Sequence, residues 1–248
     1  MIYILIHGSW HTGEAWHKVE KILTARGTTV YAPTLSGMAS MANPGGPDVG
    51  LTTHIDDIVR LIETKDLTDV ILVGHSYSGI VITGVADRLP ERVSQLVYLD
   101  AFIPENNQSL FDIMGPESAA GMRAGLVNAA GQSKADGATE VWLLPPGDAR
   151  FYLGDDADEA EVAWLQARLV YKPVRTFEEK LRLERPGAVR AIPGVFIRCT
   201  QFPYLAAQAD KARALGWPVF AVESGHDAML TAPEALSEAL LQIGQNVQ

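Results

Sequence analysis

Six short apolar runs, rich in β-branched residues, are the feature that most restricts the fold of this chain. The runs stay apolar almost throughout instead of alternating with polar residues, and most of them end at Gly, Pro or a polar residue. That pattern is typical of strands that are buried on both faces of a parallel sheet. The runs are Ile2–Ile6, Thr28–Tyr31, Val70–Val73, Val93–Leu99, Val195–Arg198 and Val219–Val222.

Segments with a helical spacing of apolar residues lie between these runs. The last of them starts near Pro233, a residue suited to a first helical turn. Strands that alternate with helices favour right-handed crossovers, so the sequence predicts an α/β fold with a doubly wound, mainly parallel six-stranded sheet. The predicted helices are Trp16–Ala25, Leu51–Thr64, Gly79–Arg88 and Ala232–Ile243.

Residues 103–192 interrupt this alternation, because they contain no apolar run of the same kind. They carry Pro-rich patches, and helix-like stretches lie near Ala157–Leu169 and Thr176–Leu183. A segment of this length is too long for a plain loop. We therefore expect an inserted, mostly helical cap over residues 103–192, with residues 1–102 and 193–248 forming the sheet-containing core.

Charge and composition narrow the class of protein. The chain has 248 residues and a formal net charge of −10, which argues against nucleic acid or an anionic membrane as a partner. Its single cysteine, Cys199, excludes an internal disulfide and fits a buried structural thiol. No stretch approaches a membrane span, and the start MIYILIHG lacks the basic residues of a signal peptide. We expect a cytoplasmic protein, which could form oligomers.

The segment GHSYSG, residues 74–79, follows the third apolar run directly. G-x-S-x-G between a strand and a helix is the nucleophile elbow, a strained corner that needs small residues two positions either side of the serine. Here the fifth position is Ser78, which is small, and Gly79 follows. The alternative is an ordinary Gly/Ser-rich turn. The position after a central strand favours Ser76 as a nucleophile, because ligand sites of open α/β sheets gather there.

An acyl-transfer site needs two N–H groups aimed at the developing oxyanion. Tyr77, directly after the predicted nucleophile, would supply one of them. The other would come from the segment IHGSW, where a strand ends in His7 and Gly8. We expect the Ser9 amide to be the second donor, with Trp10 as the alternative, and His7 to be a hydrogen-bonded structural residue.

Ser76 also needs a base. His226 follows the last predicted strand, at the same sheet edge as Ser76, in the segment ESGHD. His75 is adjacent to the serine, so its ring should point away from it. The remaining three, His11, His17 and His54, fit solvated positions in loops or on helix faces.

A serine and a histidine that act together need a third residue, a carboxylate that binds the imidazole and completes a catalytic triad. This acid is harder to place. The loop after the penultimate strand, RCTQFP, contains no Asp or Glu, and the next carboxylate, Asp210, lies in a probable helix. Asp100 follows the preceding strand at the correct edge, so we favour it as the acid, although it could instead cap its own loop. Glu223 and Asp227 are weaker alternatives, because they are close to His226 in sequence.

The segments HGSWHTGEAW, GHSYSG and SGHDAML together resemble the α/β-hydrolase superfamily. The likeness is strongest to the branch that holds plant methylesterases, hydroxynitrile lyases and related bacterial esterases. It covers nearly the whole chain and is weakest in the cap. It implies Ser76 as nucleophile, His226 as base, the Ser9 and Tyr77 amides as oxyanion hole, and no metal or cofactor. Plant members carry Asp after the penultimate strand, where this chain has none.

The lyase members of that branch use a threonine in the first loop and a lysine just after the catalytic histidine. The corresponding residues here are Gly8 and Asp227, so we favour hydrolysis of a small apolar or aromatic ester, lactone, thioester, carbamate or amide. A hydroxynitrile lyase and a non-catalytic ligand-binding protein are the alternatives. Trp10, Phe102, Trp142 and Trp164 are the candidate substrate-binding residues, with Tyr77 and Phe151 also near the expected entrance.

Overall fold

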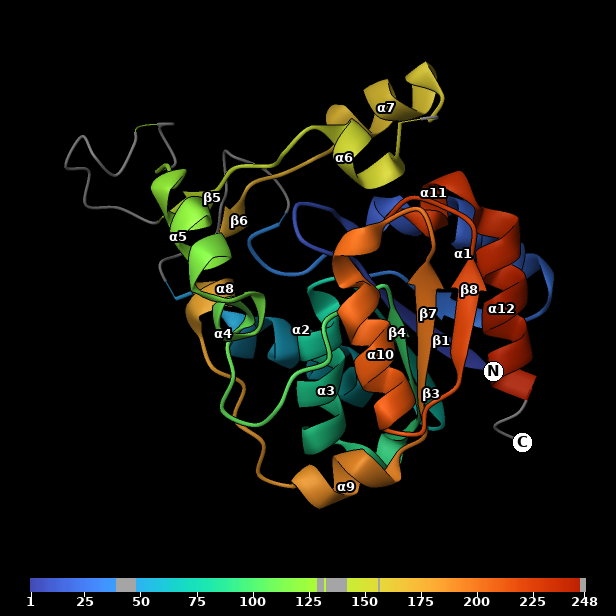
Figure 1. Cartoon of the computed structure of the whole chain (residues 1–248). Helices are drawn as coiled ribbons and strands as arrows, with labels where there is room; N and C mark the ends of the chain where they lie inside the picture. The colour runs from blue at the N-terminus through green and yellow to red at the C-terminus, as the bar shows by residue number, and fades with distance from the viewer. Residues whose placement is uncertain (39–47, 129–131, 133–141, 156, 246–248) are drawn as a thin grey trace.

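The apolar runs form one parallel sheet at the centre of the protein (Figure 1), as seen in a computed structural model that describes residues 1–38, 48–128, 132, 142–155 and 157–245. The strand order is β2-β1-β3-β4-β7-β8. Three predicted strands have the expected bounds, and β3 runs two residues further than predicted, to His75. The strands are β1 Ile2–Ile6, β2 Thr29–Tyr31, β3 Val70–His75, β4 Val93–Leu99, β7 Gly194–Cys199 and β8 Val219–Val222.

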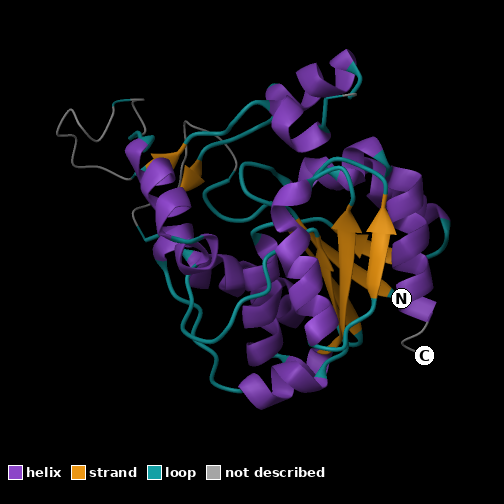
Figure 2. Ribbon diagram, in the orientation of Figure 1, coloured by secondary structure: helices purple, strands orange, loops and turns teal. Residues whose placement is uncertain are grey.

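Both faces of the sheet are covered by helices (Figure 2), which explains why the strands are apolar on both sides. The side chains of alternate residues in one strand pack on opposite faces of the sheet. Ile4 of β1 packs in the cluster formed with α2 (Leu51–Thr64), α3 (Ser78–Arg88) and α10 (Ala206–Ala214). Leu5 packs in the cluster formed with α1 (His17–Ala25) and α12 (Pro233–Gln245). The predicted doubly wound α/β architecture is confirmed.

Two predicted helices are found, and each follows a separate short helix that was not predicted. The 3-10 turn η1 Gly13–Trp16 precedes α1, which begins at His17. The single turn α11 Ala228–Thr231 precedes α12, which begins at Pro233. The proline starts the second helix because its fixed φ suits a first turn.

Between β4 and β7 lies the predicted helical insert. Short helices alternate there with a two-stranded antiparallel ribbon formed by β5 and β6. Two of the helices, α6 and α7, lie above the ends to which the strand arrows point (Figure 1). The limits 103–192 of the cap stay a prediction. The elements are α4 Leu110–Met114, α5 Pro116–Ala124, β5 Leu143–Leu144, α6 Ala149–Leu153, α7 Glu159–Gln166, β6 Lys172–Pro173, α8 Arg175–Glu178 and α9 Pro186–Ala191.

The helix predicted over Thr176–Leu183 is wrong for most of its length. Only the single turn α8 forms, and the chain leaves the helix at Glu179, whose backbone is extended. The reason is a pairing with an earlier loop: the Leu181 N–H donates to the Gln108 carbonyl at 2.8 Å, and the Asn107 N–H donates to the Leu181 carbonyl at 2.8 Å. Tertiary hydrogen bonds replace the helical ones that local spacing favours.

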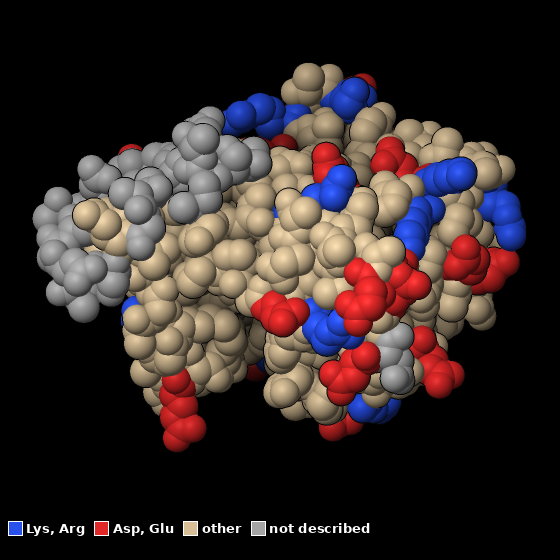
Figure 3. All heavy atoms as spheres, turned by 90° about the horizontal axis from the view of Figure 1, so that it is seen from above, with Lys and Arg blue, Asp and Glu red and all other residues tan. Residues whose placement is uncertain are grey.

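None of the helices in the described ranges is long and apolar enough to cross a membrane. On the face toward which the strands point, acidic and basic side chains are intermixed (Figure 3).

Candidate active site

Ser76 occupies a strained corner between β3 and α3. Its φ is 55°, in the left-handed region that costs energy for a residue with a side chain. Two backbone hydrogen bonds of 3.1 Å hold the corner: the Ser76 N–H donates to Leu99, and its carbonyl accepts from Phe102. The residue is partly exposed. This backbone conformation is the one that the elbow motif requires.

Close packing explains the small residues around Ser76. A Cβ at Gly74 would lie 2.5 Å from the Ser78 carbonyl oxygen, and a Cβ at Gly79 would lie 2.2 Å from the Phe102 carbonyl oxygen. Ser78 itself is fully buried, and its hydroxyl donates to the His7 carbonyl. The serine at the fifth motif position is therefore accommodated by a hydrogen bond, and the glycine after it is required by the space available.

The first loop runs beside the corner. A Cβ at Gly8 would lie 3.0 Å from the Ser76 Cβ. The amides of Ser9, Trp10 and Tyr77 donate no hydrogen bond to any part of the chain that the structure describes. The cap holds this loop, because the Trp10 indole N–H donates to Leu144 at 3.1 Å and the Trp10 carbonyl accepts from Val170 at 2.8 Å. Free amides next to a strained serine can bind an oxyanion.

His226 and Asp100 are brought together, although 126 positions separate them in the chain. The His226 Nδ1 lies 2.7 Å from the Asp100 Oδ2, and both side chains are buried. Because a carboxylate only accepts, Nδ1 carries the proton and Nε2 is left as a base. Asp100, with φ 39°, is fixed by its own N–H, which donates to Ile197 at 2.7 Å.

No hydrogen bond joins the Ser76 hydroxyl to His226 within the described residues. The rings of His75 and His226 have centroids 4.4 Å apart, so the residue before the serine lies directly against the base. Bonds between nucleophile and base are often long in ligand-free sites and tighten with substrate.

The structure changes the expectation for two of the other histidines. His11 and His54 are buried, not solvated, whereas His17 is exposed as expected. The His54 ring accepts from the Tyr77 hydroxyl at 2.9 Å and donates to Ser36 at 2.8 Å, and burial lowers its pKa well below the usual range. Local sequence could not show this, because its partners come from other parts of the chain.

His7 is a hydrogen-bonded structural residue, as expected. Its Nδ1 donates to Gly8 at 2.8 Å and its Nε2 accepts from the Leu35 N–H at 3.1 Å. Burial lowers the pKa of His7 to about 3, so the ring is neutral.

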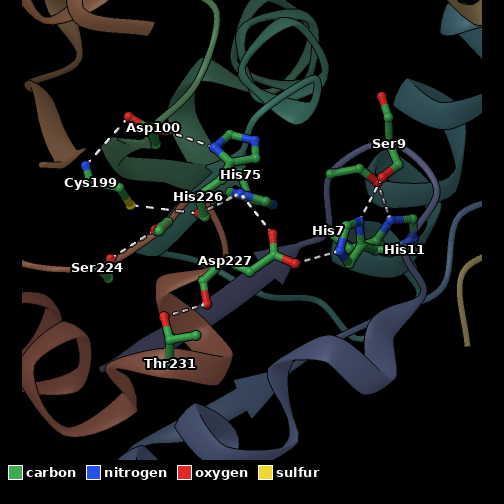
Figure 4. A network of polar contacts seen from close by, with 12 residues as sticks. His7, Ser9, His11, His75, Asp100, Cys199, Ser224, His226, Asp227 and Thr231 are labelled. Carbon is green, nitrogen blue, oxygen red and sulfur yellow. Dashed lines mark hydrogen bonds and ion pairs between the residues drawn. The ribbon is translucent and has the colours of Figure 1, made fainter. Parts of the chain in front are cut away.

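A second group of polar residues, His11, His75 and Asp227, lies next to His226 (Figure 4). His11 Nε2 lies 2.7 Å from the Asp227 Oδ2, and the His75 Nε2 donates to the His226 carbonyl at 3.1 Å. Asp227 therefore pairs with His11 and not with the His226 ring. The His75 ring lies against His226, so it points into this group.

The expected buried thiol is found. Cys199 is fully buried, and burial raises the pKa of its thiol well above the usual range. Its Sγ lies 3.6 Å from the His226 carbonyl. Within the described residues, no group of three or more His, Cys, Asp and Glu is arranged to hold a metal ion.

The four predicted substrate-binding aromatics lie in different places. The Trp10 ring lies 6.1 Å from the rings of Tyr152 and Phe177, and the Phe102 N–H donates to the Ser76 carbonyl.

The other two predicted aromatics belong to the cap. The carbonyl of Trp142 accepts from the Val174 N–H. Trp164 of α7 packs on His17 with centroids 4.8 Å apart, and among the described residues its ring contacts are with His17 and Arg168. Phe151 is half exposed.

Two aromatic residues next to His226 were missed by the sequence reasoning. The Phe202 ring stacks on the His226 ring, with centroids 4.3 Å apart and planes 24° apart. The Tyr152 ring of α6 lies 6.5 Å from the His226 ring. Phe202 could have been found, because it occupies the loop after β7 where an acid was sought. Tyr152 had no signal in its local sequence.

The comparisons with known proteins cover the whole site. The model of the alpha/beta hydrolase family matches residues 3–239. A relative from Nocardioides sp. (strain SG-4G), named carbendazim hydrolyzing esterase, is 35% identical over 98% of this chain and 99% of its own length. Methylesterase 1 of Arabidopsis thaliana is 24% identical over 97% of this chain and 95% of its own.

A solved structure with the same fold is an extracellular alpha/beta-hydrolase from a Paenibacillus species, described as sharing structural and functional homology with tobacco salicylic acid binding protein 2. It has a TM-score of 0.79 and 26% identity, and the match covers 98% of each chain. Full-length relatives that are esterases identify this chain as a hydrolase acting on ester bonds. By its sequence match and its fold, the chain belongs to the alpha/beta hydrolase family.

Proposed function

We propose that the protein hydrolyses small esters or carbamates with an apolar or aromatic part, using Ser76, His226 and Asp100 as a catalytic triad. The observation that carries the proposal is the 2.7 Å pairing of His226 Nδ1 with Asp100, at the sheet edge where Ser76 stands with φ 55°. This arrangement leaves one imidazole nitrogen of His226 able to accept a proton at the sheet edge that carries a partly exposed alcohol, and nucleophilic catalysis by serine needs both groups.

In the first half-reaction the Ser76 Oγ attacks the substrate carbonyl carbon while His226 Nε2 takes the hydroxyl proton. The amides of Ser9 and Tyr77 bind the oxyanion, and Asp100 stabilises the imidazolium that forms. Collapse of the tetrahedral intermediate breaks the bond to the leaving alcohol or amine, which takes the proton from Nε2. An acyl or carbamoyl group remains on Ser76.

In the second half-reaction water attacks the acyl carbon and gives its proton to His226 Nε2. The intermediate collapses, the acid is released, and the proton returns to Ser76. The Tyr77 amide is well suited to bind the oxyanion. The Tyr77 side chain is fixed by its hydrogen bond to His54, and this holds the amide in place.

The aromatic surroundings support a flat, apolar substrate. Trp10, Tyr152 and Phe202 lie close to the base or to the oxyanion loop. One relative is named after the carbamate carbendazim, which it hydrolyses. Carbendazim is therefore the first carbamate to test.

Two observations count against the lyase alternative. Gly8 stands where the lyases carry a threonine, and a Cβ there would lie 2.7 Å from the His75 Nδ1. Asp227 stands where they carry a lysine, and it is a carboxylate paired with His11.

The proposal is tested with a panel of p-nitrophenyl acetate, p-nitrophenyl butyrate, carbendazim and mandelonitrile, combined with labelling by a fluorophosphonate. The wild type should turn over at least one ester or carbamate and carry one label on the peptide that contains Ser76, whereas Ser76→Ala should do neither. Ser94→Ala is the matched control, because Ser94 binds Val70 at the opposite end of the strands. Cleavage of the cyanohydrin without ester turnover, or an active Ser76→Ala variant, would contradict the proposal.

A further inference from the structure

We infer that His11 is an imidazolium at neutral pH and that its buried ion pair with Asp227 positions the oxyanion loop against the loop of the base. His11 and Asp227 are then positioning residues of the site, neither of them a member of the triad. The effect on catalysis rests on the proposed function, whereas the charge state of His11 does not.

The hydrogen bonds of His11 fix its charge. Its Nδ1 lies 2.6 Å from the Ser9 carbonyl oxygen, and its Nε2 lies 2.7 Å from the Asp227 Oδ2. A carbonyl only accepts, and so does an ionised carboxylate, so both ring nitrogens must carry hydrogen. Only the imidazolium does so.

The electrostatics agree with this assignment. Burial by itself lowers the pKa of His11, but the charge and hydrogen bond of Asp227, with the Ser9 carbonyl, raise it above its usual value. Burial raises the pKa of Asp227, but the charge and hydrogen bond of His11 outweigh it and hold that pKa at about 2. The two side chains are at most 2% exposed, so water screens the pair little.

The pair joins segments that are far apart in the chain. His11 binds the carbonyl of Ser9, the predicted oxyanion donor, and Asp227 directly follows His226. The Asp227 N–H also donates to the Tyr152 carbonyl of the cap at 3.1 Å. One ion pair thus connects the first loop, the base loop and α6, as the close view of the first two shows (Figure 4).

His75 completes the network from β3. Its Nε2 donates to the His226 carbonyl and lies 3.7 Å from the Asp227 Oδ1. Burial, with the neighbouring His226, lowers the pKa of His75 well below the usual range, so this ring is neutral. The Asp227 charge is therefore balanced by one cation, His11, which makes the pair a defined unit.

Several groups face His226 and determine the charge that it experiences. From β4 comes the Asp100 carboxylate, from β3 the neutral His75 ring, from the cap Tyr152 and from the end of β7 the thiol of Cys199. Burial raises the pKa of both the phenol and the thiol, so these two groups are uncharged. The charges around His226 are thus those of Asp100, Asp227 and His11.

The charge of His11 is tested by ¹⁵N NMR of the imidazole groups in the Ser76→Ala protein, which needs no activity. His11 should show two slowly exchanging ring N–H protons, and its imidazolium nitrogen shifts should persist above about pH 6.5, where an ordinary histidine loses its proton. A His11 resonance that titrates near pH 6.5 would overturn the inference even if the protein hydrolyses esters. An inactive protein with an imidazolium at His11 would overturn the proposed function alone.

The positioning role is tested by a cycle of His11→Asn, Asp227→Asn and the double variant. Each single variant should lower kcat/KM by about 10- to 100-fold. The double variant should lose no more than the worse single one, because the pair acts as a unit. His11→Asn leaves the Asp227 charge unbalanced near His226, so it should move the acid limb of the pH profile up. Asp227→Asn should move that limb less, because His11 loses the carboxylate that keeps it protonated and both charges disappear together.

Asp87→Asn is the matched control. Asp87 is a buried carboxylate that accepts from the Glu184 and Arg185 amides on the other side of the molecule. This variant should lose stability without a change in the pH profile. Independent losses in the cycle, or an acid limb that does not move up in His11→Asn, would overturn the positioning role.

Discussion

The ring of Phe202 lies flat on the imidazole of His226, with centroids 4.3 Å apart. Phe202 belongs to the loop after β7, and only 7% of its surface is exposed. It extends outward to Tyr204 and Phe151, which are 70% and 50% exposed. An aromatic ring therefore covers one face of the base, and the cluster to which the ring belongs reaches the surface.

Phe202→Leu should lower kcat/KM for aromatic esters by about tenfold, since an aromatic pair contributes about 0.5–1.5 kcal/mol beyond the burial of its area. Leucine keeps the site apolar, so the folded protein should persist. Steady-state kinetics with p-nitrophenyl butyrate measure the effect. Tyr204→Leu, at the exposed end of the same cluster, serves as the control and should differ from wild type by less than about threefold. Equal losses in both variants would argue against a role for the stack on His226.

Asp100→Asn should lower kcat by about 10³- to 10⁴-fold with little change in KM, because an amide at this position favours the wrong tautomer of His226. Glu223→Gln and Asp210→Asn change the exposed carboxylates nearest in sequence to the base and to the loop after β7, and both should remain active. Kinetics on the three variants decide which acid serves the base. An active Asp100→Asn protein would remove Asp100 from the triad.

The strands and the elbow were predictable because their signals are local. Val93–Leu99 is apolar except at Ser94 and Gln95, and the strand β4 has those bounds. Asp100 could be placed for the same reason, since a residue directly after a parallel strand lies at the sheet edge where the other strands also end. The Ser76 corner follows from the spacing of small residues around it.

The remaining features depend on contacts between distant segments. The His11–Asp227 pair joins residues 216 positions apart, and neither residue has a neighbour that predicts burial. Tyr152 reaches His226 from a five-residue helix in the cap, too short to give a periodic pattern. Hydrophobic periodicity predicts which residues form the core, but it does not predict which buried polar groups contact one another.

Lys172 is a buried lysine in the cap strand β6. Its Nζ lies 3.4 Å from the centroid of the Tyr77 ring and has no hydrogen-bond partner in the portion of the chain that the structure covers. Burial lowers its pKa well below the usual range, because the charged form is disfavoured away from water. An unsatisfied buried amine destabilises the fold.

Lys172→Met should therefore raise the free energy of unfolding by about 1–3 kcal/mol near pH 7. In the wild type the unfolded chain binds a proton that the folded protein does not, between the lowered pKa and about 10.4. Stability of the wild type should rise with pH across this window, and the gain from Met should shrink toward pH 10. Urea unfolding at pH 7, 8.5 and 10 measures both trends. A Met variant that is less stable at every pH would mean that the amine stabilises the fold.

Gly8→Ala should lower the catalytic rate more than it lowers the stability of the fold. The added methyl group would lie 2.7 Å from the His75 Nδ1 and 3.0 Å from the Ser76 Cβ, so one of these must move. We expect kcat to fall about 10²-fold, because a shift of about 1 Å at a nucleophile costs that much. Gly121→Ala in α5, where nothing lies within 4 Å, should keep full activity and gain up to about 1 kcal/mol in stability. Kinetics and thermal unfolding of the two variants separate the contributions. A fully active Gly8→Ala protein would show that the first loop has room beside the nucleophile, and would remove the steric argument against a side chain at this position.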